Sequence, residues 1–201
     1  MVPKTPTRRS REPVQQRSRE AASALKTAAA KVLVQHGYAH ATTNRIAQRA
    51  GVSIGTLYQY FPNKDAVFQA CAADFLVVLR DASKDAVRDA STHTLEQRLE
   101  RLARSAVEVL AAHPGFLRAL DAAPIPGFRE ITRRAREEVR AEIETMLAQL
   151  RPEATPHDNA YAARVLAAAG EGIALDVLPG DDLDRLAREI SKLALRYLAT
   201  A

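Results

Sequence analysis

Apolar residues recur at intervals of three and four along most of the chain, which is the spacing of one face of an amphipathic helix. The first apolar face follows residue 15 and comprises Ala21, Leu25, Ala28, Ala29, Val32 and Leu33. Gly37 is expected to end this helix, because glycine is a common helix terminator. Two short helices, over 43–50 and 53–61, are predicted next, separated by Gly51.

The same helical spacing continues to the C-terminus, interrupted by proline, glycine and capping residues. A long helix is predicted from Asn63 to about Ser91, and Thr94 with Gln97 resembles a capping box that opens the next helix. Later helices are predicted over 116–122, 128–151, 157–177 and from Asp181 or Asp182 onwards. No segment shows the alternation of a strand, so the pattern predicts an all-α protein of about nine helices.

Charge divides the chain into two unequal parts. Residues 1–64 contain 11 Lys or Arg and 2 acidic residues, a net charge of +9, whereas the other 137 residues hold 18 basic and 22 acidic residues, a net charge of −4. The total is the +5 of the whole chain. A basic first third favours a polyanionic partner, and a solvated charged surface is the simpler alternative.

Residues 43–61, TNRIAQRAGVSIGTLYQYF, have the pattern of a helix-turn-helix. Gly51 permits the left-handed corner that this motif needs. A small apolar core is predicted at Ile46, Ala47, Ala50, Val52 and Leu57. The second helix offers side chains suited to phosphates and base edges, at Ser53, Thr56, Tyr58, Gln59 and Tyr60. A purely structural hairpin is the alternative, but the basic charge and the polar second helix favour DNA binding.

Residues 15–67, and above all TTNRIAQRAGVSIGTLYQYFPNKDAV, closely resemble the DNA-binding domain of the tetracycline-repressor (TetR) family of bacterial transcription regulators. The resemblance implies an N-terminal three-helix DNA-binding domain with a helix-turn-helix, assigned to 15–64. The implied DNA contacts are Thr43, Asn44, Arg45, Ser53, Gly55, Thr56, Tyr58, Gln59, Tyr60 and Lys64. Arg17 is expected to add phosphate affinity.

Residues 1–14 are predicted to form a flexible basic arm. Its Arg8, Arg9 and Arg11 are candidates for contacts in the minor groove of DNA, and a disordered basic tail without such contacts is an equal alternative. The resemblance further implies that residues 65–201 form a helical domain that binds a small-molecule effector and makes a homodimer through the last two helices.

Apolar positions on the last two helices agree with such a dimer, since two copies would bury them as a four-helix bundle. These positions are Leu166, Ala169, Ile173, Leu183, Leu186, Ile190, Leu193 and Tyr197. The alternative is that they pack within their own domain. Candidate pocket residues, each also a plausible core residue, are Phe75, Leu79, Leu102, Phe116, Leu120, Phe128, Met146 and Tyr161. Glu171 is a candidate polar ligand contact or simply an exposed acid.

The sequence offers no catalytic or metal-binding constellation. His36 and His40 are four residues apart, but Gly37 interrupts the helix between them. With the single Cys71 no internal disulfide is possible, which suits a reducing compartment. No membrane span or signal-peptide core is found. We therefore expect a cytoplasmic bacterial protein that is not an enzyme, has no cofactor or metal, and does not bind a membrane.

Together these features predict a dimeric transcription regulator, a repressor released from a palindromic operator by a small-molecule effector. Its expected partners are double-stranded operator DNA, a second copy of itself and an unidentified small molecule. One alternative is a DNA-binding activator or architectural protein without a pocket. The other is a helical enzyme whose basic segment serves only solubility.

Overall fold

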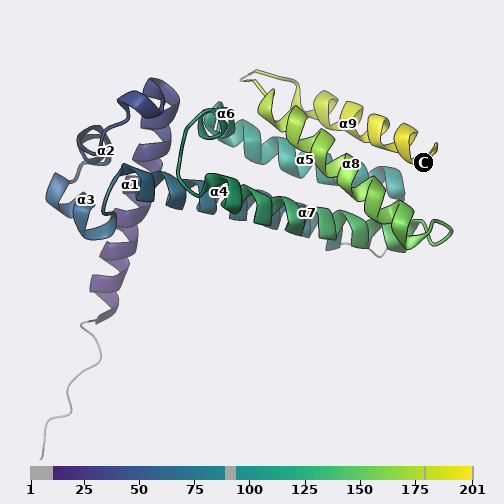
Figure 1. Ribbon diagram of the computed structural model, residues 1–201, viewed down its shortest axis with the longest axis horizontal. Coiled ribbons are helices and arrows are strands. Elements are labelled where there is room, and N and C mark those ends of the chain that lie inside the picture. The colour runs from purple at the N-terminus through teal and green to yellow at the C-terminus, as the bar shows by residue number, and fades with distance from the viewer. Residues whose placement is uncertain (1–10, 89–93, 179, 201) are drawn as a thin grey trace, which may run out of the picture. The chain divides into compact units, whose positions relative to one another are not determined.

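The computed structural model describes residues 11–88, 94–178 and 180–200, apart from the side chains of residues 11–15, 88 and 174. These residues form nine α-helices and no strand, which confirms the predicted fold class (Figure 1). The helices are α1 (Arg11–His40), α2 (Thr43–Ala50), α3 (Ile54–Tyr60), α4 (Lys64–Arg88), α5 (Leu95–Ala112), α6 (Phe116–Asp121), α7 (Phe128–Leu150), α8 (Pro156–Leu175) and α9 (Leu183–Leu198).

Most predicted helix ends are confirmed by their capping hydrogen bonds. Thr94 and Gln97 form the full capping box of α5. The Asn63 side chain accepts a hydrogen bond of 2.9 Å from the Ala66 amide, and Asp182, rather than Asp181, caps α9. Side-chain oxygens at these positions bond amide groups that the helix itself leaves unpaired.

The first helix begins earlier than predicted, and its regular part ends at Gly37 as predicted. It begins at Arg11, four residues earlier than expected, and so takes in the last part of the segment predicted as an arm. Gly37 does interrupt it, with φ 65° and ψ 168°, but a further turn continues to His40. A positive φ is accessible to glycine because it has no Cβ.

The chain divides within α4 into two compact units, one up to Cys71 and one from Ala72. In the first unit, α1 packs on α2, and α2 on α3. Each of these elements, together with the start of α4, contributes fully buried side chains to the core, namely Leu25, Ala29, Leu33, Ile46, Leu57, Val67 and Phe68.

In the second unit, α5 packs against α9 and α7 against α8, and Figure 1 shows these four helices running alongside one another. Together with the end of α4, these four helices contribute to one apolar cluster. It consists of Val87, Leu99, Ile143, Met146, Leu147, Ala162, Ala163, Ala194 and Leu198. Apolar residues at three- and four-residue spacing therefore supply the core, as amphipathic helices do.

Tyr38 connects the end of α1 to the start of α4 within the first unit. Its hydroxyl donates a hydrogen bond to the Asp65 carboxylate. The Lys64 ammonium donates to the Tyr38 carbonyl at 2.9 Å and lies 3.9 Å from the centre of the Tyr38 ring. The bond to Asp65, helped by burial and by the Asp65 charge, raises the pKa of Tyr38 from 10.0 to about 12.

Replacing Tyr38 with phenylalanine should lower the free energy of unfolding by about 1–2 kcal/mol, because the bond to a charged acceptor is lost while the ring remains. Because the pKa of Tyr38 is raised in the folded state, its hydrogen bond stabilises the folded protein fully below pH 10. This contribution is lost as the pH rises through about 12. Urea unfolding at a series of pH values should therefore give a difference between the two proteins that is constant to about pH 10 and shrinks above it. Tyr161→Phe, at an exposed tyrosine, is the control; a difference that does not change with pH would contradict the assignment.

Candidate DNA interface and effector cavity

The helix-turn-helix is built from α2, a glycine corner and α3. Thr42 caps α2 by accepting a hydrogen bond of 3.3 Å from the Arg45 amide. Gly51 ends that helix in the left-handed conformation, with φ 69° and ψ 27°, and its amide bonds the Gln48 carbonyl at 3.2 Å. Because that conformation strains other residues, the predicted role of Gly51 as the corner is confirmed.

The small core of the motif contains fewer buried residues than predicted. Ile46, Ala47 and Leu57 are buried, at 0%, 2% and 0% exposure, as expected. Ala50 and Val52 are only half-buried. Both flank the corner, where the chain turns at the surface of the unit, so fewer neighbours cover them.

The surface of α3 carries the side chains predicted to meet DNA. Ser53 caps the helix, accepting a hydrogen bond of 3.0 Å from the Thr56 amide. Tyr58 is 52% exposed, and Gln59 is exposed beside it. Gly55 is exposed too, and a Cβ there would meet only the Ser53 hydroxyl, at 3.7 Å. Packing within the protein therefore leaves space for a side chain at this position.

The start of α2 lies next to α3. The Thr43 and Tyr58 hydroxyls are 3.3 Å apart, which brings two of the predicted DNA residues together. Asn44 and Arg45 are exposed on the first turn of α2. The Arg45 guanidinium donates to the His40 carbonyl at 2.6 Å, so it is held at the end of α1.

The other predicted DNA residues lie farther along the chain. Arg17 is exposed on α1, and Tyr60 is half-buried at the end of α3. Lys64 is half-buried and engaged with Tyr38, so its ammonium is less free than an exposed lysine on a helix end. Arg8 and Arg9 lie outside the described residues, as does the side chain of Arg11.

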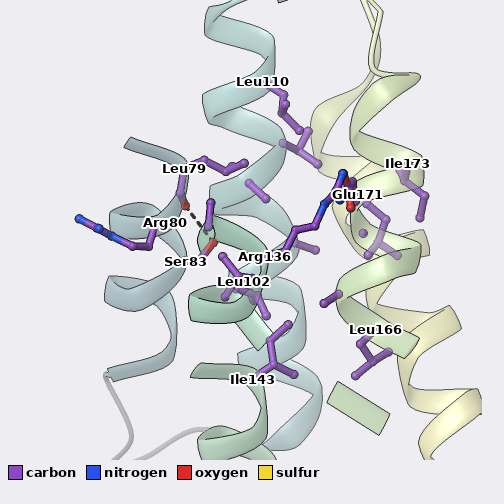
Figure 2. A pocket seen from close by; sticks show the side chains of 18 of the residues that line it. Leu79, Arg80, Ser83, Leu102, Leu110, Arg136, Ile143, Leu166, Glu171 and Ile173 are labelled. Atoms are coloured by element: carbon purple, nitrogen blue, oxygen red, sulfur yellow. Dashed lines mark hydrogen bonds and ion pairs between the residues drawn. The ribbon is translucent and has the colours of Figure 1, made fainter. Parts of the chain in front are cut away.

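A cavity of about 190 Å³ lies within the second unit (Figure 2). Its walls come from α4, α5, α6, α7, α8 and α9, and most of the lining side chains are leucine, isoleucine, valine or alanine. Among the described residues, no aromatic side chain lines it. Three predicted pocket residues, Leu79, Leu102 and Glu171, are on its wall.

Six predicted pocket residues lie elsewhere. Phe75, Phe116, Leu120, Phe128 and Met146 are buried, but they pack among other side chains instead of facing the cavity. Phe75, for instance, lies edge-on to Phe116, with ring centres 5.4 Å apart. Tyr161 is 52% exposed and contacts Arg164 at its ring face. Aromatic rings predicted to line a pocket thus fill the core or face solvent.

Arg136 is a cavity residue that the sequence analysis missed. It lies on α7, and its guanidinium pairs with Glu171 on α8, as Figure 2 shows. The two residues are 35 positions apart, and α7 is rich in charged residues of both signs. Nothing in the local pattern therefore distinguished Arg136 from its exposed neighbours.

The predicted dimer residues fall into three groups. Leu166, Ile173 and Ile190 line the cavity, so they pack within their own unit. Ala169 and Leu193 are exposed. The half-buried remainder consists of Leu183, Leu186 and Tyr197. Tyr161, Ala168 and Gly172 are additionally exposed along α8.

Two further features concern the classes of protein considered above. Within the described ranges, no helix combines the length and apolar composition needed to cross a membrane. In the same part of the chain, no three His, Cys, Asp or Glu side chains are grouped so as to hold a metal ion. Cys71 is buried, and its thiol donates to the Lys26 carbonyl at 3.3 Å.

A helix-turn-helix unit joined to a helical unit with an apolar cavity defines a ligand-responsive DNA-binding regulator. Two family profiles match the chain: "Bacterial regulatory proteins, tetR family" over residues 25–71 and "Tetracyclin repressor-like, C-terminal domain" over residues 94–198. The chain belongs to the TetR family of transcription regulators. These regulators are DNA-binding repressors with a ligand-binding C-terminal domain, and they are not enzymes.

Solved structures share this fold at low sequence identity. The fatty acid degradation regulator FadR from Bacillus halodurans is 21% identical, with a TM-score of 0.73, over 87% of this chain and 94% of that one. A TetR-like transcriptional regulator from Rhodococcus sp. RHA1 is 24% identical, with a TM-score of 0.72, over 90% and 97%. A proposed fatty acid metabolism regulator from Clostridium perfringens is 22% identical, with a TM-score of 0.69, over 86% and 97%. No curated protein matches the sequence.

Proposed function

We propose that this chain is a cytoplasmic homodimer that represses transcription from a two-fold symmetric operator and leaves it when a slender aliphatic molecule occupies the cavity. The apolar lining of the cavity is the observation that carries this proposal. An effector acts by binding one conformation of the repressor better than another, so a cavity in the regulatory unit is where such preference arises.

The shape and chemistry of the cavity support an aliphatic effector. Its volume of about 190 Å³ is below the roughly 300–1,000 Å³ of most ligand pockets, which favours a slender molecule. Without an aromatic ring in the lining, a flat aromatic ligand would have no stacking partner. One structure that shares the fold is of a fatty acid degradation regulator and another is of a proposed fatty acid metabolism regulator, which makes alkyl compounds sensible first probes.

The course of α4 supports a link between the effector and DNA. This helix begins at Lys64, directly after the helix-turn-helix, and its later residues Leu76, Leu79 and Ser83 line the cavity. A ligand that shifts those residues acts on the same helix that follows α3. In a dimer, such a shift would change the separation of the two copies of α3, the recognition helix of each helix-turn-helix, and weaken operator binding.

An operator is obtained by selecting bound fragments from a random pool of double-stranded DNA. We expect the selected sequences to contain an inverted repeat, because a two-fold dimer reads two equivalent half-sites. Fluorescence anisotropy on that operator should then reveal that 1-octanol weakens binding by roughly 5–150-fold. If the selected DNA shows no sequence preference, the proposal of a specific operator is wrong. If no alkyl compound weakens operator binding, the proposal of an aliphatic effector is wrong.

A substitution that fills the cavity should separate operator binding from the response to the effector. Ala106 lines it from α5 and is half-buried, so Ala106→Phe should occupy ligand space. We expect this variant to bind the operator as the wild type does and to lose its response to 1-octanol. Ala112→Phe, at an exposed position of the same helix, is the control and should respond normally.

A further inference from the structure

Few of the polar side chains that line the cavity point a free group into it. In the part of the chain that the structure describes, the polar side chains that line it are those of Arg80, Ser83, Thr132, Arg136, Glu171 and Ser191. The three hydroxyls each donate to a helix carbonyl, at 2.9 Å for Ser83, 3.0 Å for Thr132 and 3.3 Å for Ser191. Their protons are therefore already used, and these residues add little polarity to the cavity.

Arg80 is likewise engaged outside the cavity. Its Nε and Nη2 donate to Asp81 at 2.9 and 2.8 Å, and its Nη1 donates to Glu138 at 3.2 Å. Figure 2 shows its guanidinium pointing away from Arg136 and Glu171. The charges that remain at the cavity wall are those of the Arg136–Glu171 pair.

The geometry of that pair leaves binding capacity on the arginine. Arg136 Nε donates to Glu171 Oε1 at 2.8 Å, and Nη2 donates to the same oxygen. A guanidinium has five N–H donors, so this end-on contact uses only part of it. Among the described residues, Nη1 has no hydrogen-bond partner. The Arg136 side chain is 55% exposed and that of Glu171 38%, so a ligand can reach the guanidinium.

We propose that Arg136 binds the carboxylate head of an aliphatic effector whose chain occupies the apolar cavity, with Glu171 as the competing internal partner. This inference rests on the proposed function, which requires that an aliphatic molecule bind there. It specifies the effector as a straight-chain carboxylate, whereas the cavity alone would accept any slender alkyl compound.

An anionic head suits the pair better than a cationic one. Guanidinium is weakly hydrated and planar, so it binds carboxylates through paired hydrogen bonds at low desolvation cost. An ammonium head is strongly hydrated and would be repelled by the Arg136 charge, although among the described residues only Oε1 of Glu171 accepts hydrogen bonds and Oε2 remains open. Arg136 Nη1 is open to a ligand carboxylate, whereas Glu171 occupies Nε and Nη2 and its negative charge weakens, without preventing, that bond.

The test compares three eight-carbon probes that differ only in the head group: octanoate, 1-octanol and octylamine. Binding is measured by isothermal titration calorimetry at neutral pH on the full-length protein. We expect wild type to bind octanoate roughly tenfold or more tightly than 1-octanol, since a hydrogen bond to a charged group is added. In Arg136→Gln that preference should disappear while 1-octanol binding is unchanged, and Glu171→Gln should tighten octanoate by removing its competitor.

Arg134→Gln is the matched control, because Arg134 is an exposed arginine of the same helix that pairs with Glu130 and does not line the cavity. It should bind all three probes as wild type does, and circular dichroism will verify that each variant is folded. If wild type binds octanoate and 1-octanol equally well, the proposed carboxylate head group is wrong, but the proposal of an aliphatic effector is not affected. Tightest binding of octylamine, weakened in Glu171→Gln, would overturn it in favour of a cation. Binding of none of the probes would overturn the aliphatic effector itself.

Discussion

Replacing Gly55 with leucine is expected to abolish specific operator binding while the protein stays folded. A side chain at this exposed position of α3 finds no obstacle inside the protein, since a Cβ would lie 3.7 Å from the Ser53 hydroxyl. In a complex, however, the recognition helix must lie close against the groove, where a leucine side chain would hold it away. Affinity should fall to the non-specific level, a loss of roughly 10³-fold or more.

Stability and binding should therefore move in opposite directions at this position. Gly55→Ala is expected to raise the free energy of unfolding by up to about 1 kcal/mol, because alanine favours helix, and still to weaken binding. Thermal unfolding gives the first quantity and fluorescence anisotropy on the selected operator the second. Ala148→Leu, which adds leucine at an exposed site of α7, controls for a general effect of surface hydrophobicity. Normal operator binding by Gly55→Leu would remove α3 from the interface.

The helix-turn-helix could be predicted because all of its determinants are local. Gly51 ends α2 and Ser53 caps α3 through bonds to residues within four positions, so a short stretch of sequence contains the whole motif. The same holds for the helix ends set by Thr94 and Asp182. Such interactions depend on residue order alone and need no knowledge of tertiary packing.

The cavity could be predicted only in part because it is assembled from distant segments. Periodicity identifies the apolar face of each helix, but which part of that face meets another helix depends on packing. Leu79 and Leu102 therefore line the cavity, while Phe128 and Met146, on equally apolar faces, fill the core. Arg98 is the extreme case: it is 1% exposed and donates to the Val87 carbonyl at 2.5 Å, although arginine normally predicts a surface position.

Tyr161 illustrates a different limit. An aromatic residue on an amphipathic helix is more often buried than exposed, so its sequence position favours the core or a pocket wall. In the structure it is 52% exposed and shares a surface of α8 with Ala168 and Gly172. On α9, Leu193 is 57% exposed. Large apolar side chains next to small residues on exposed helix faces are typical of a surface that another helix covers, which agrees with a dimer through these two helices.

Replacing Leu193 with glutamate is accordingly expected to produce a monomer that no longer binds the full operator tightly. A two-fold interface contains each position twice, so one substitution introduces two like charges into an apolar surface. The monomer would lose the advantage of binding two half-sites at once, a loss of roughly 10²–10⁴-fold in affinity. Analytical ultracentrifugation measures the oligomeric state, and anisotropy on the operator measures the affinity.

Arg188→Glu provides the matched control, because it places the same charge at an exposed position of the same helix, about 140° around the helix axis from Leu193. It should remain dimeric and bind the operator, apart from a small effect of the changed net charge. A DNA fragment that contains one half-site distinguishes dissociation from misfolding. A folded Leu193→Glu monomer should bind this fragment with the same weak affinity as the wild-type protein does. If Leu193→Glu stays dimeric with full operator affinity, the exposed faces of α8 and α9 do not form the dimer, and the two recognition units must be joined through another surface.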